Sequence, residues 1–243
     1  MWLGSGTFPT GSRQLNPQTH RSPNCGARRD GARPDIVVIH YTAMGDHTAA
    51  RDWLCHADAE VSAHYIISAQ GEVDQLVDEA ARAWHAGAGR WGDVTDVNSR
   101  SIGIELSNTG VTPFAAAQMD ALETLLAGIM TRWNITPDRV IGHSDMAPGR
   151  KVDPGARFDW ARLARRGMAV KLSPVAGAKV DIGQFLNDLR VAGYTADASD
   201  DGLLSAFRLR HRQGVAGPLD ATDCALAEQL AKRFPVDQTV PSA

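Results

Sequence analysis

The chain has 243 residues, of which 43% are hydrophobic and 22% are charged, and its formal net charge is -3. These proportions are typical of an ordinary soluble globular protein and argue against a disordered chain or a membrane protein. A slightly acidic chain also lacks the concentrated basic surface that phosphate binding requires, so we expect no nucleic-acid partner. The length suits one well-buried domain and a smaller second one.

The first segment, residues 1–33, is rich in Gly, Pro, Ser, Arg and Asn. We expect an irregular arm that lies on the surface of the domain and contributes no core residues. The N-terminus has neither the basic leader nor the apolar stretch of a signal peptide, and no later segment resembles a transmembrane span. Cys25, Cys55 and Cys224 are odd in number and far apart, so three reduced thiols are expected.

Strands are predicted next, at residues 36–42, 63–68, 72–77, 101–107 and 140–143. Gln70 and Gly71 predict a hairpin between the second and the third of these strands. A helix is predicted at residues 48–56, and a longer one begins with Thr112 as N-cap and Pro113 at the first helical position. The longer helix has a buried stripe at helical spacing, formed by Met119, Leu122, Leu125, Leu126, Ile129, Met130 and Trp133.

Strands and helices that alternate in this way, with one clear hairpin, predict an α/β fold with a central mixed β-sheet flanked by helices. A short helix at residues 159–168 is expected to close a first domain of residues 1–172. Residues 173–178, which include Pro174 and Gly177, suit a linker. Helical patterns at residues 181–192, 200–212 and 222–234 then predict a small three-helix domain, residues 179–236, that has no catalytic cluster of its own.

Three residues that can bind a metal ion follow strands or lie in a tight loop. His40 ends the apolar run 36–39, His143 ends the run 140–142, and Asp153 follows ten residues after His143. A lone histidine at a strand end is more often a hydrogen-bonded structural residue, but two imidazoles and one carboxylate form the ligand set of an open catalytic zinc site. Lys151 lies in the loop between the last two ligands, where its charge can face a water molecule or a substrate oxygen.

Seven short blocks follow one another along residues 30–168. They are I-H-Y-T at 39–42, V-S-A-H-Y-I-I at 61–67, A-W-H-A-G at 83–87, the single Asn98, S-I-G-I-E-L at 101–106, G-H-S-D at 142–145 and K-V-D-P at 151–154. In this order they resemble the zinc-dependent N-acetylmuramoyl-L-alanine amidases, the type 2 amidase family that is related to the peptidoglycan recognition proteins. Residues 179–236, with Tyr194, Asp201 and Phe207, more loosely resemble the three-helix peptidoglycan-binding module that some of these amidases carry.

The resemblance implies hydrolysis of the amide bond between N-acetylmuramic acid and L-alanine of the stem peptide, in peptidoglycan or in soluble muropeptides. It implies one zinc ion bound by His40, His143 and Asp153. It also implies that Glu105 takes the proton from the attacking water and that Lys151 stabilises the tetrahedral oxyanion. A carboxylate in the apolar strand 101–107 is costly unless it has a function or a partner, which supports a role for Glu105.

Four further residues of these blocks are candidates for substrate binding. His64 and His85 are expected to line the substrate groove or to orient a metal ligand through hydrogen bonds. Trp84 can present an aromatic face to sugar or peptide, although buried packing fits it equally well. Asn98 is expected to position the stem peptide. Ala63 stands where some relatives have a tyrosine near the metal, so catalysis here cannot depend on that phenol.

Two other functions compete with the amidase. A non-catalytic peptidoglycan-recognition protein shares the architecture but usually lacks a zinc ligand, and this chain retains all three. A zinc peptidase that cuts within the stem peptide is the other alternative, but the chain has no His-Glu-x-x-His motif. The C-terminal module favours the bacterial cell envelope or periplasm, whereas the missing leader favours the cytoplasm. The compartment, the oligomeric state and any requirement for a 1,6-anhydro sugar stay open at this point.

Overall fold

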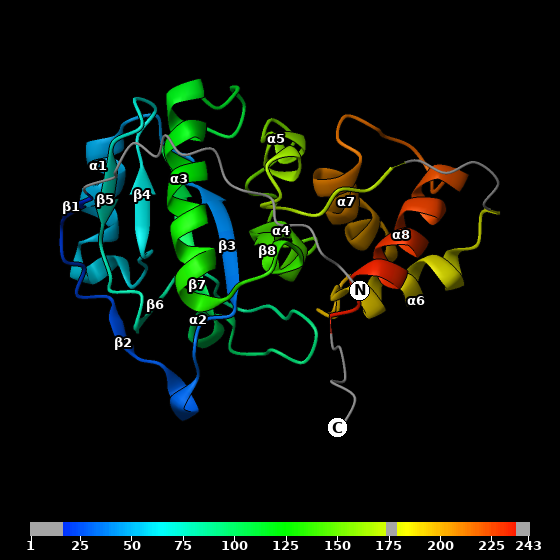
Figure 1. Ribbon diagram of the computed structural model, residues 1–243, viewed down its shortest axis with the longest axis horizontal. Helices are drawn as coiled ribbons and strands as arrows, with labels where there is room; N and C mark the ends of the chain where they lie inside the picture. Colours follow the sequence, from blue (N-terminus) through cyan, green and yellow to red (C-terminus); the bar gives the residue numbers. More distant parts are fainter. Residues whose placement is uncertain (1–16, 174–178, 237–243) are drawn as a thin grey trace.

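The computed structural model describes residues 17–173 and 179–236. A six-stranded sheet occupies the centre, in the order β1-β5-β4-β7-β3-β8 (Figure 1). Its strands are β1 (Gln18–Thr19), β3 (Ile36–Tyr41), β4 (Tyr65–Ile67), β5 (Val73–Gln75), β7 (Ser101–Leu106) and β8 (Val140–Gly142). Neighbouring strands run parallel except for β4 and β5, which are antiparallel, so the predicted mixed sheet is confirmed.

The predicted hairpin connects β4 and β5. Tyr65 is in register with Gln75, and Ile67 is in register with Val73. Gly71 in the turn has a φ of 84°, a conformation that glycine adopts without a steric penalty. Both strands of the hairpin are shorter than the sequence predicts.

The described part of the N-terminal arm, residues 17–33, is more ordered than expected. It contributes β1 at the edge of the main sheet, and it contributes β2 (Cys25–Ala27), which pairs antiparallel with β6 (Ala81–Ala83) in a second sheet. Ser22 Oγ donates to the Leu54 carbonyl at 2.6 Å, and Asn24 Nδ2 donates to the carbonyl of Val61 at 2.8 Å. The prediction of an irregular arm is therefore wrong for this part, which forms two short strands and is attached by buried polar side chains, whereas none of residues 17–33 belongs to the buried hydrophobic core. Residues 1–16 lie outside the described residues.

The α-helices of the described residues begin and end as follows: α1 (His47–Leu54), α2 (Val97–Arg100), α3 (Ala116–Trp133), α4 (His143–Met146), α5 (Trp160–Arg165), α6 (Ile182–Ala192), α7 (Asp200–His211) and α8 (Ala221–Arg233). Short 3-10 turns occur at Arg29–Gly31, Ala57–Ala59 and Pro137–Arg139. Helix α3 starts later than predicted, with Ala115 as its N-cap. Thr112 does not cap it, because the Thr112 hydroxyl donates to Asn108 Oδ1 instead.

The two faces of β3 belong to different hydrophobic clusters, because side chains alternate along a strand. Val37 and Ile39 pack with the buried stripe of α3, which crosses one face of the sheet (Figure 1). Ile36 and Val38 point the other way and share a cluster with Phe185 of α6 and residues of α7 and α8. The sheet is therefore covered on both faces, as the predicted α/β class requires.

The three C-terminal helices lie side by side at one end of the molecule (Figure 1). Phe185 and Leu189 of α6 and Phe207 of α7 belong to the same hydrophobic cluster as Ile141 of β8. The three predicted helices are confirmed, whereas the boundary at residues 173–178 stays a prediction because residues 174–178 lie outside the described part. Within the described ranges, none of the helices combines the length and the apolar character that a membrane crossing needs.

Candidate active site

The candidate site lies where three parallel strands end. His40, near the end of β3, is in register with Glu105 of β7, and His143 directly follows β8. The carboxyl ends of parallel strands meet at one edge of a sheet, where sites of α/β proteins commonly form. Asp153 comes from the loop after α4, and its carbonyl accepts a hydrogen bond of 2.9 Å from the backbone N–H of Ser144.

Three candidate ligand atoms converge at this edge. His40 Nδ1 lies 3.0 Å from His143 Nδ1, and both nitrogens lie close to Asp153 Oδ2, at 2.9 and 3.0 Å respectively. All three residues are buried, and within the described residues they form the group of His, Cys, Asp and Glu side chains that could bind a metal ion. Two nitrogen atoms and one carboxylate oxygen this close together fit the donor set of a catalytic zinc site.

A chain of hydrogen bonds fixes the protonation of His40. The carbonyl of Val97 can only accept, so the Ser101 hydroxyl donates to it at 2.5 Å. Ser101 Oγ then accepts from His85 Nε2 at 3.1 Å, which leaves His85 Nδ1 to accept from His40 Nε2 at 3.0 Å. The remaining nitrogen of His40, Nδ1, therefore carries the lone pair that faces Asp153, as a metal ligand requires.

The second imidazole is oriented in the same way. His143 Nε2 lies 2.8 Å from the carbonyl oxygen of Ala86, which can only accept a hydrogen bond. His143 Nε2 therefore carries the proton, and Nδ1 is again the free nitrogen. Hydrogen bonds of this kind to the outer nitrogen hold a metal-binding imidazole in one tautomer and one orientation.

The ionisation of the cluster also suits a metal ion. Burial, reinforced by the nearby His143, lowers the pKa of His40 to about 4, so this imidazole is neutral at neutral pH. Burial opposes ionisation of Asp153, but the adjacent imidazoles of His143 and His40 outweigh it and lower the pKa of this carboxyl. Neutral imidazoles and an ionised carboxylate are the forms that coordinate metals.

Glu105 and Lys151 line one cavity with the three candidate ligands, and its volume is about 370 Å³. Burial, together with the negative charge of Asp153, raises the pKa of Glu105 to about 8, and the charge of Lys151 opposes this shift. Within the described residues, Glu105 Oε2 is buried and has no hydrogen-bond partner. A buried carboxylate oxygen without a partner is costly, so this atom is suited to bind water or substrate.

The four predicted substrate-binding residues divide into two pairs. Trp84 and His85 line the cavity, whereas His64 and Asn98 do not. His64 is fully buried beneath β7, where its Nδ1 accepts from the backbone N–H of Gly103 at 3.0 Å. Both side chains therefore point into the protein and away from the cavity, and their role in substrate binding stays a prediction.

Asn98 supports the site through the backbone of His85 and Ala86 and does not line the cavity. Its Oδ1 accepts from the backbone N–H groups of His85, at 3.0 Å, and Ala86, at 2.9 Å. These two residues carry the hydrogen-bond acceptors for His40 and His143. Asn98 thus fixes the segment that orients both candidate ligands.

Gly103 is a structural requirement that the sequence analysis missed. It lies on the same face of β7 as Ser101 and Glu105, and the ring of His85 packs directly on it. A Cβ atom at this position would lie 2.4 Å from His85 Cγ. A glycine in the middle of a buried strand is the signal that could have indicated a close approach of this kind.

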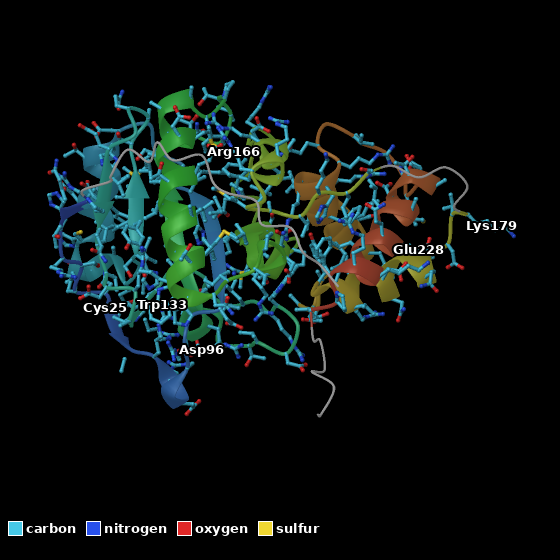
Figure 2. All side chains as sticks on the ribbon, in the orientation of Figure 1. Cys25, Asp96, Trp133, Arg166, Lys179 and Glu228 are labelled. Carbon is cyan, nitrogen blue, oxygen red and sulfur yellow. The ribbon has the colours of Figure 1, made fainter. Side chains whose placement is uncertain are left out.

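A second and larger cavity, of about 820 Å³, lies at the other end of β7 and contains none of the candidate catalytic residues. Asp96 and Trp133, labelled in Figure 2, are two of the residues that line it. Some of its charged groups are paired: Arg100 binds Asp35, and Arg29 lies 3.5 Å from Asp96. The cluster of metal-binding side chains lies in the smaller cavity, so we assign the chemistry to that cavity.

The model of one known family, described as N-acetylmuramoyl-L-alanine amidase, matches residues 30–156 of the chain. The chain belongs to this family. All five candidate catalytic and metal-binding residues lie inside the matched region of this amidase.

Individual relatives agree with this assignment. This amidase is 34% identical over 239 residues to N-acetylmuramoyl-L-alanine amidase AmiD of Escherichia coli K12. The aligned region covers 84% of this chain and 85% of AmiD. The solved complex of E. coli AmiD with anhydro-N-acetylmuramic acid-L-Ala-D-gamma-Glu-L-Lys has a TM-score of 0.77 and 33% identity, over 87% of this chain and 93% of that one. AmpDh3 from Pseudomonas aeruginosa, in complex with anhydromuramic pentapeptide, has a TM-score of 0.74 and 27% identity, over 97% and 99%.

Proposed function

We propose that this amidase binds one zinc ion through His40 Nδ1, His143 Nδ1 and Asp153 Oδ2. We propose further that it uses this ion to hydrolyse the bond between N-acetylmuramic acid and L-alanine. The observation that carries the proposal is the convergence of the three ligand atoms, all within 4.8 Å of one another, beside Glu105. When bound, zinc would act as a Lewis acid and would lower the pKa of a water molecule.

The protein supplies the proton transfers. Glu105 takes a proton from the attacking water through its buried Oε2 and then donates it to the departing nitrogen of L-alanine. Without a metal ion the pKa of Glu105 is raised to about 8, close to neutral pH, the range in which one carboxyl group can serve as base and then as acid. The amide carbon–nitrogen bond breaks, and the products are a lactyl carboxylate and a free peptide amine.

Lys151 supplies positive charge to the oxygen that becomes negative in the transition state. It lines the cavity beside Asp153, and within the described residues no carboxylate forms an ion pair with its ammonium group. A cation that is not neutralised by a neighbour is available to the substrate, and such preorganised charge stabilises an oxyanion.

The substrate class proposed here is a muropeptide with a 1,6-anhydro sugar. Support comes from the two related structures, whose bound molecules are an anhydro-N-acetylmuramic acid tripeptide and an anhydromuramic pentapeptide. Trp84 and the exposed Trp53 line the cavity and offer aromatic faces to the sugar or the stem peptide. Action in the cell envelope remains a proposal that rests on the looser resemblance of residues 179–236 to a peptidoglycan-binding module.

Release of stem peptide tests the proposal. Purified anhydro-muropeptides and reducing muropeptides are incubated with zinc-loaded protein, chelated protein and the Glu105→Gln variant, and the products are identified by mass spectrometry. We expect free peptide with an N-terminal L-alanine, loss of the product on chelation, its return with zinc, and a rate at least about 100-fold lower in the variant.

The same products separate the alternatives. Cleavage between two residues of the stem peptide would identify a peptidase and contradict the amidase. Binding of peptidoglycan without any product would indicate a recognition protein, although the presence of His40, His143, Asp153, Glu105 and Lys151 in one cavity favours catalysis. Equal rates on both sugar forms would contradict the preference for the anhydro sugar and leave the amidase activity intact.

A further inference from the structure

Asp145 lies in α4, two residues after the candidate ligand His143, and it is completely buried. Its Oδ2 accepts from the backbone N–H of Gly142 at 2.7 Å, which closes the turn from β8 into α4. Two side chains from residues 179–236, which we call the helical unit, reach this carboxylate. The Tyr194 hydroxyl donates to Oδ1 at 2.7 Å, and Arg210 Nη1 lies 3.2 Å from Oδ2.

Arg210 makes a second contact on the other side of the same turn. Its Nη2 donates to the carbonyl of Val140 at 2.8 Å, and its guanidinium lies 5.2 Å from the centre of the Trp160 ring. One planar, buried cation therefore connects the strand before His143 to the carboxylate after it. The two donors of a guanidinium are fixed relative to each other, so this contact sets the spacing of Val140 and Asp145.

The helical unit also contacts the segment of Trp91 and Gly92, which lies shortly after the residue that orients His143. The ring of Trp91 packs edge-on against Tyr194, with the ring centres 5.1 Å apart. The backbone N–H of Gly92 donates to the Gly193 carbonyl at 3.0 Å, and the Thr195 hydroxyl donates to the Gly92 carbonyl at 2.7 Å. This segment begins shortly after Ala86, whose carbonyl accepts the proton of His143 Nε2.

We propose that Tyr194 and Arg210 are positioning residues for His143, and that the helical unit is a permanent part of the metal-site scaffold. The inference rests on the proposed zinc site and extends it to a part of the chain outside the family match, which ends at residue 156. Removing one partner of a buried ion pair leaves the other charge without compensation, and here that charge sits one turn from a metal ligand. The role follows from contacts inside the protein and requires no bound glycan.

Arg208 provides a matched control. It lies on the same helix, is also buried, and pairs with the buried Asp223 at 2.5 Å. Its other partners are the carbonyls of Gly217 and Pro218, so all of these contacts stay inside the helical unit. Arg208→Met therefore removes a comparable buried ion pair without touching the turn that carries His143.

The test measures zinc affinity in the full chain without substrate, by competition with a coloured chelator, for Tyr194→Phe, Arg210→Met and Arg208→Met. We expect the first two variants to bind zinc about 10-fold more weakly, the lower end of the range for loss of a ligand's own hydrogen-bond partner, because they act on His143 through the turn, and Arg208→Met to stay within about twofold. Thermal unfolding of each metal-free variant shows how far folding itself is affected.

Wild-type zinc affinity in folded Tyr194→Phe and Arg210→Met would overturn the inference. An equal loss of affinity in Arg208→Met, at an equal loss of thermal stability, would overturn it too, because general loosening would then explain the effect. If Arg210→Met does not fold, the zinc affinities of Tyr194→Phe and Arg210→Lys test the inference instead. Each of these variants keeps a large aromatic or polar side chain in place. Zinc binding by wild type without release of peptide would reject the proposed reaction and leave these affinity ratios valid.

Discussion

At the scale of single residues, Lys151 is the cation that stabilises the oxyanion in the proposed mechanism. Replacing it by methionine keeps most of the length of the side chain and removes the charge. We expect kcat to fall about 100- to 1,000-fold, the cost of losing one oxyanion stabiliser, with a smaller change in KM. Steady-state kinetics on a muropeptide measures both constants.

Lys171 is the control for this substitution, because it is exposed and lies outside the cavity. Lys171→Met should leave kcat unchanged. A Lys151→Met enzyme with wild-type kcat would show that the transition state receives its positive charge from elsewhere.

His64 makes stability depend on pH. Burial, with a contribution from the charge of Arg28, lowers the pKa of His64 to about 3, whereas the unfolded chain has a value of about 6.5. Below about pH 6.5, His64 therefore binds a proton in the unfolded state but stays neutral in the folded state. The free energy of unfolding consequently decreases as the pH falls from about 6.5 towards 3. The free energy of unfolding should decrease by about 1.4 kcal/mol per pH unit for this residue alone.

Urea unfolding at pH 7 and pH 5 tests this dependence in wild type and in His64→Asn, whose side-chain oxygen can accept the hydrogen bond from Gly103. The variant should be less stable at pH 7 but should lose less stability on acidification. His56, which has an exposed side chain, is the matched position, and His56→Asn should keep the wild-type slope. Identical slopes for wild type and His64→Asn would contradict the assignment.

The convergence of His40, His143 and Asp153 could be anticipated from the sequence, because the two histidines end apolar runs that predict strands of one mixed sheet. The directions of the side chains of His64 and Asn98 could not be predicted from the sequence. A match to a family block places a residue near a site along the chain, but it does not show whether the side chain faces the cavity or the protein interior. Asn98 faces inward, where its single oxygen binds two backbone N–H groups.

At the scale of elements, β7 needs a glycine at position 103, because the ring of His85 packs directly against it. Gly103→Ala should displace His85, break its hydrogen bond to His40 and lower both zinc affinity and stability, because the added Cβ meets ring atoms at 2.4 to 2.6 Å. Zinc titration and thermal unfolding of the purified variant measure the two effects.

Gly26 in β2 is the matched strand glycine, and a Cβ added there has no neighbour within 4 Å. Gly26→Ala should therefore leave zinc affinity unchanged. Unaltered zinc affinity in Gly103→Ala would mean that the strand can move aside and that His85 is not held by this contact.

The boundaries of elements were less predictable than their existence. The apolar stripe of α3 identifies the helix, because these residues pack on the sheet. The start of the helix was harder to predict, because the Thr112 hydroxyl binds Asn108 Oδ1 and does not cap the helix. The arm is a stronger example, since Ser22 and Asn24 attach it through hydrogen bonds to carbonyl groups of distant residues. Hydrophobic periodicity carries no information about such bonds.

At the scale of the whole molecule, one hydrophobic cluster joins the sheet to the helical unit, through Ile36, Val38 and Ile141 on one side and Phe185 and Phe207 on the other. We expect calorimetry of the full chain to show a single cooperative transition, with equal calorimetric and van't Hoff enthalpies. Two separate transitions would show that the sheet and the helical unit unfold independently.

Removal of the metal should lower the temperature of this transition without dividing it. A ligand that binds only the folded state adds about 2.7 kcal/mol when its concentration is 100 times the dissociation constant. Scans with a chelator and with zinc in that excess measure the difference. No shift between the two scans would contradict a zinc site in the folded protein.

The ligand atoms come from parts of the chain that are far apart: His40 and His143 are separated by 103 residues, and His40 and Asp153 by 113. Their meeting requires β3 and β8 to pair, and such long-range pairing is slow because a long loop must close first. The unfolded chain consequently offers no preformed site. Zinc bound at the proposed site should then act mainly by slowing unfolding and have little influence on the rate of folding, so we expect binding to follow folding of the chain.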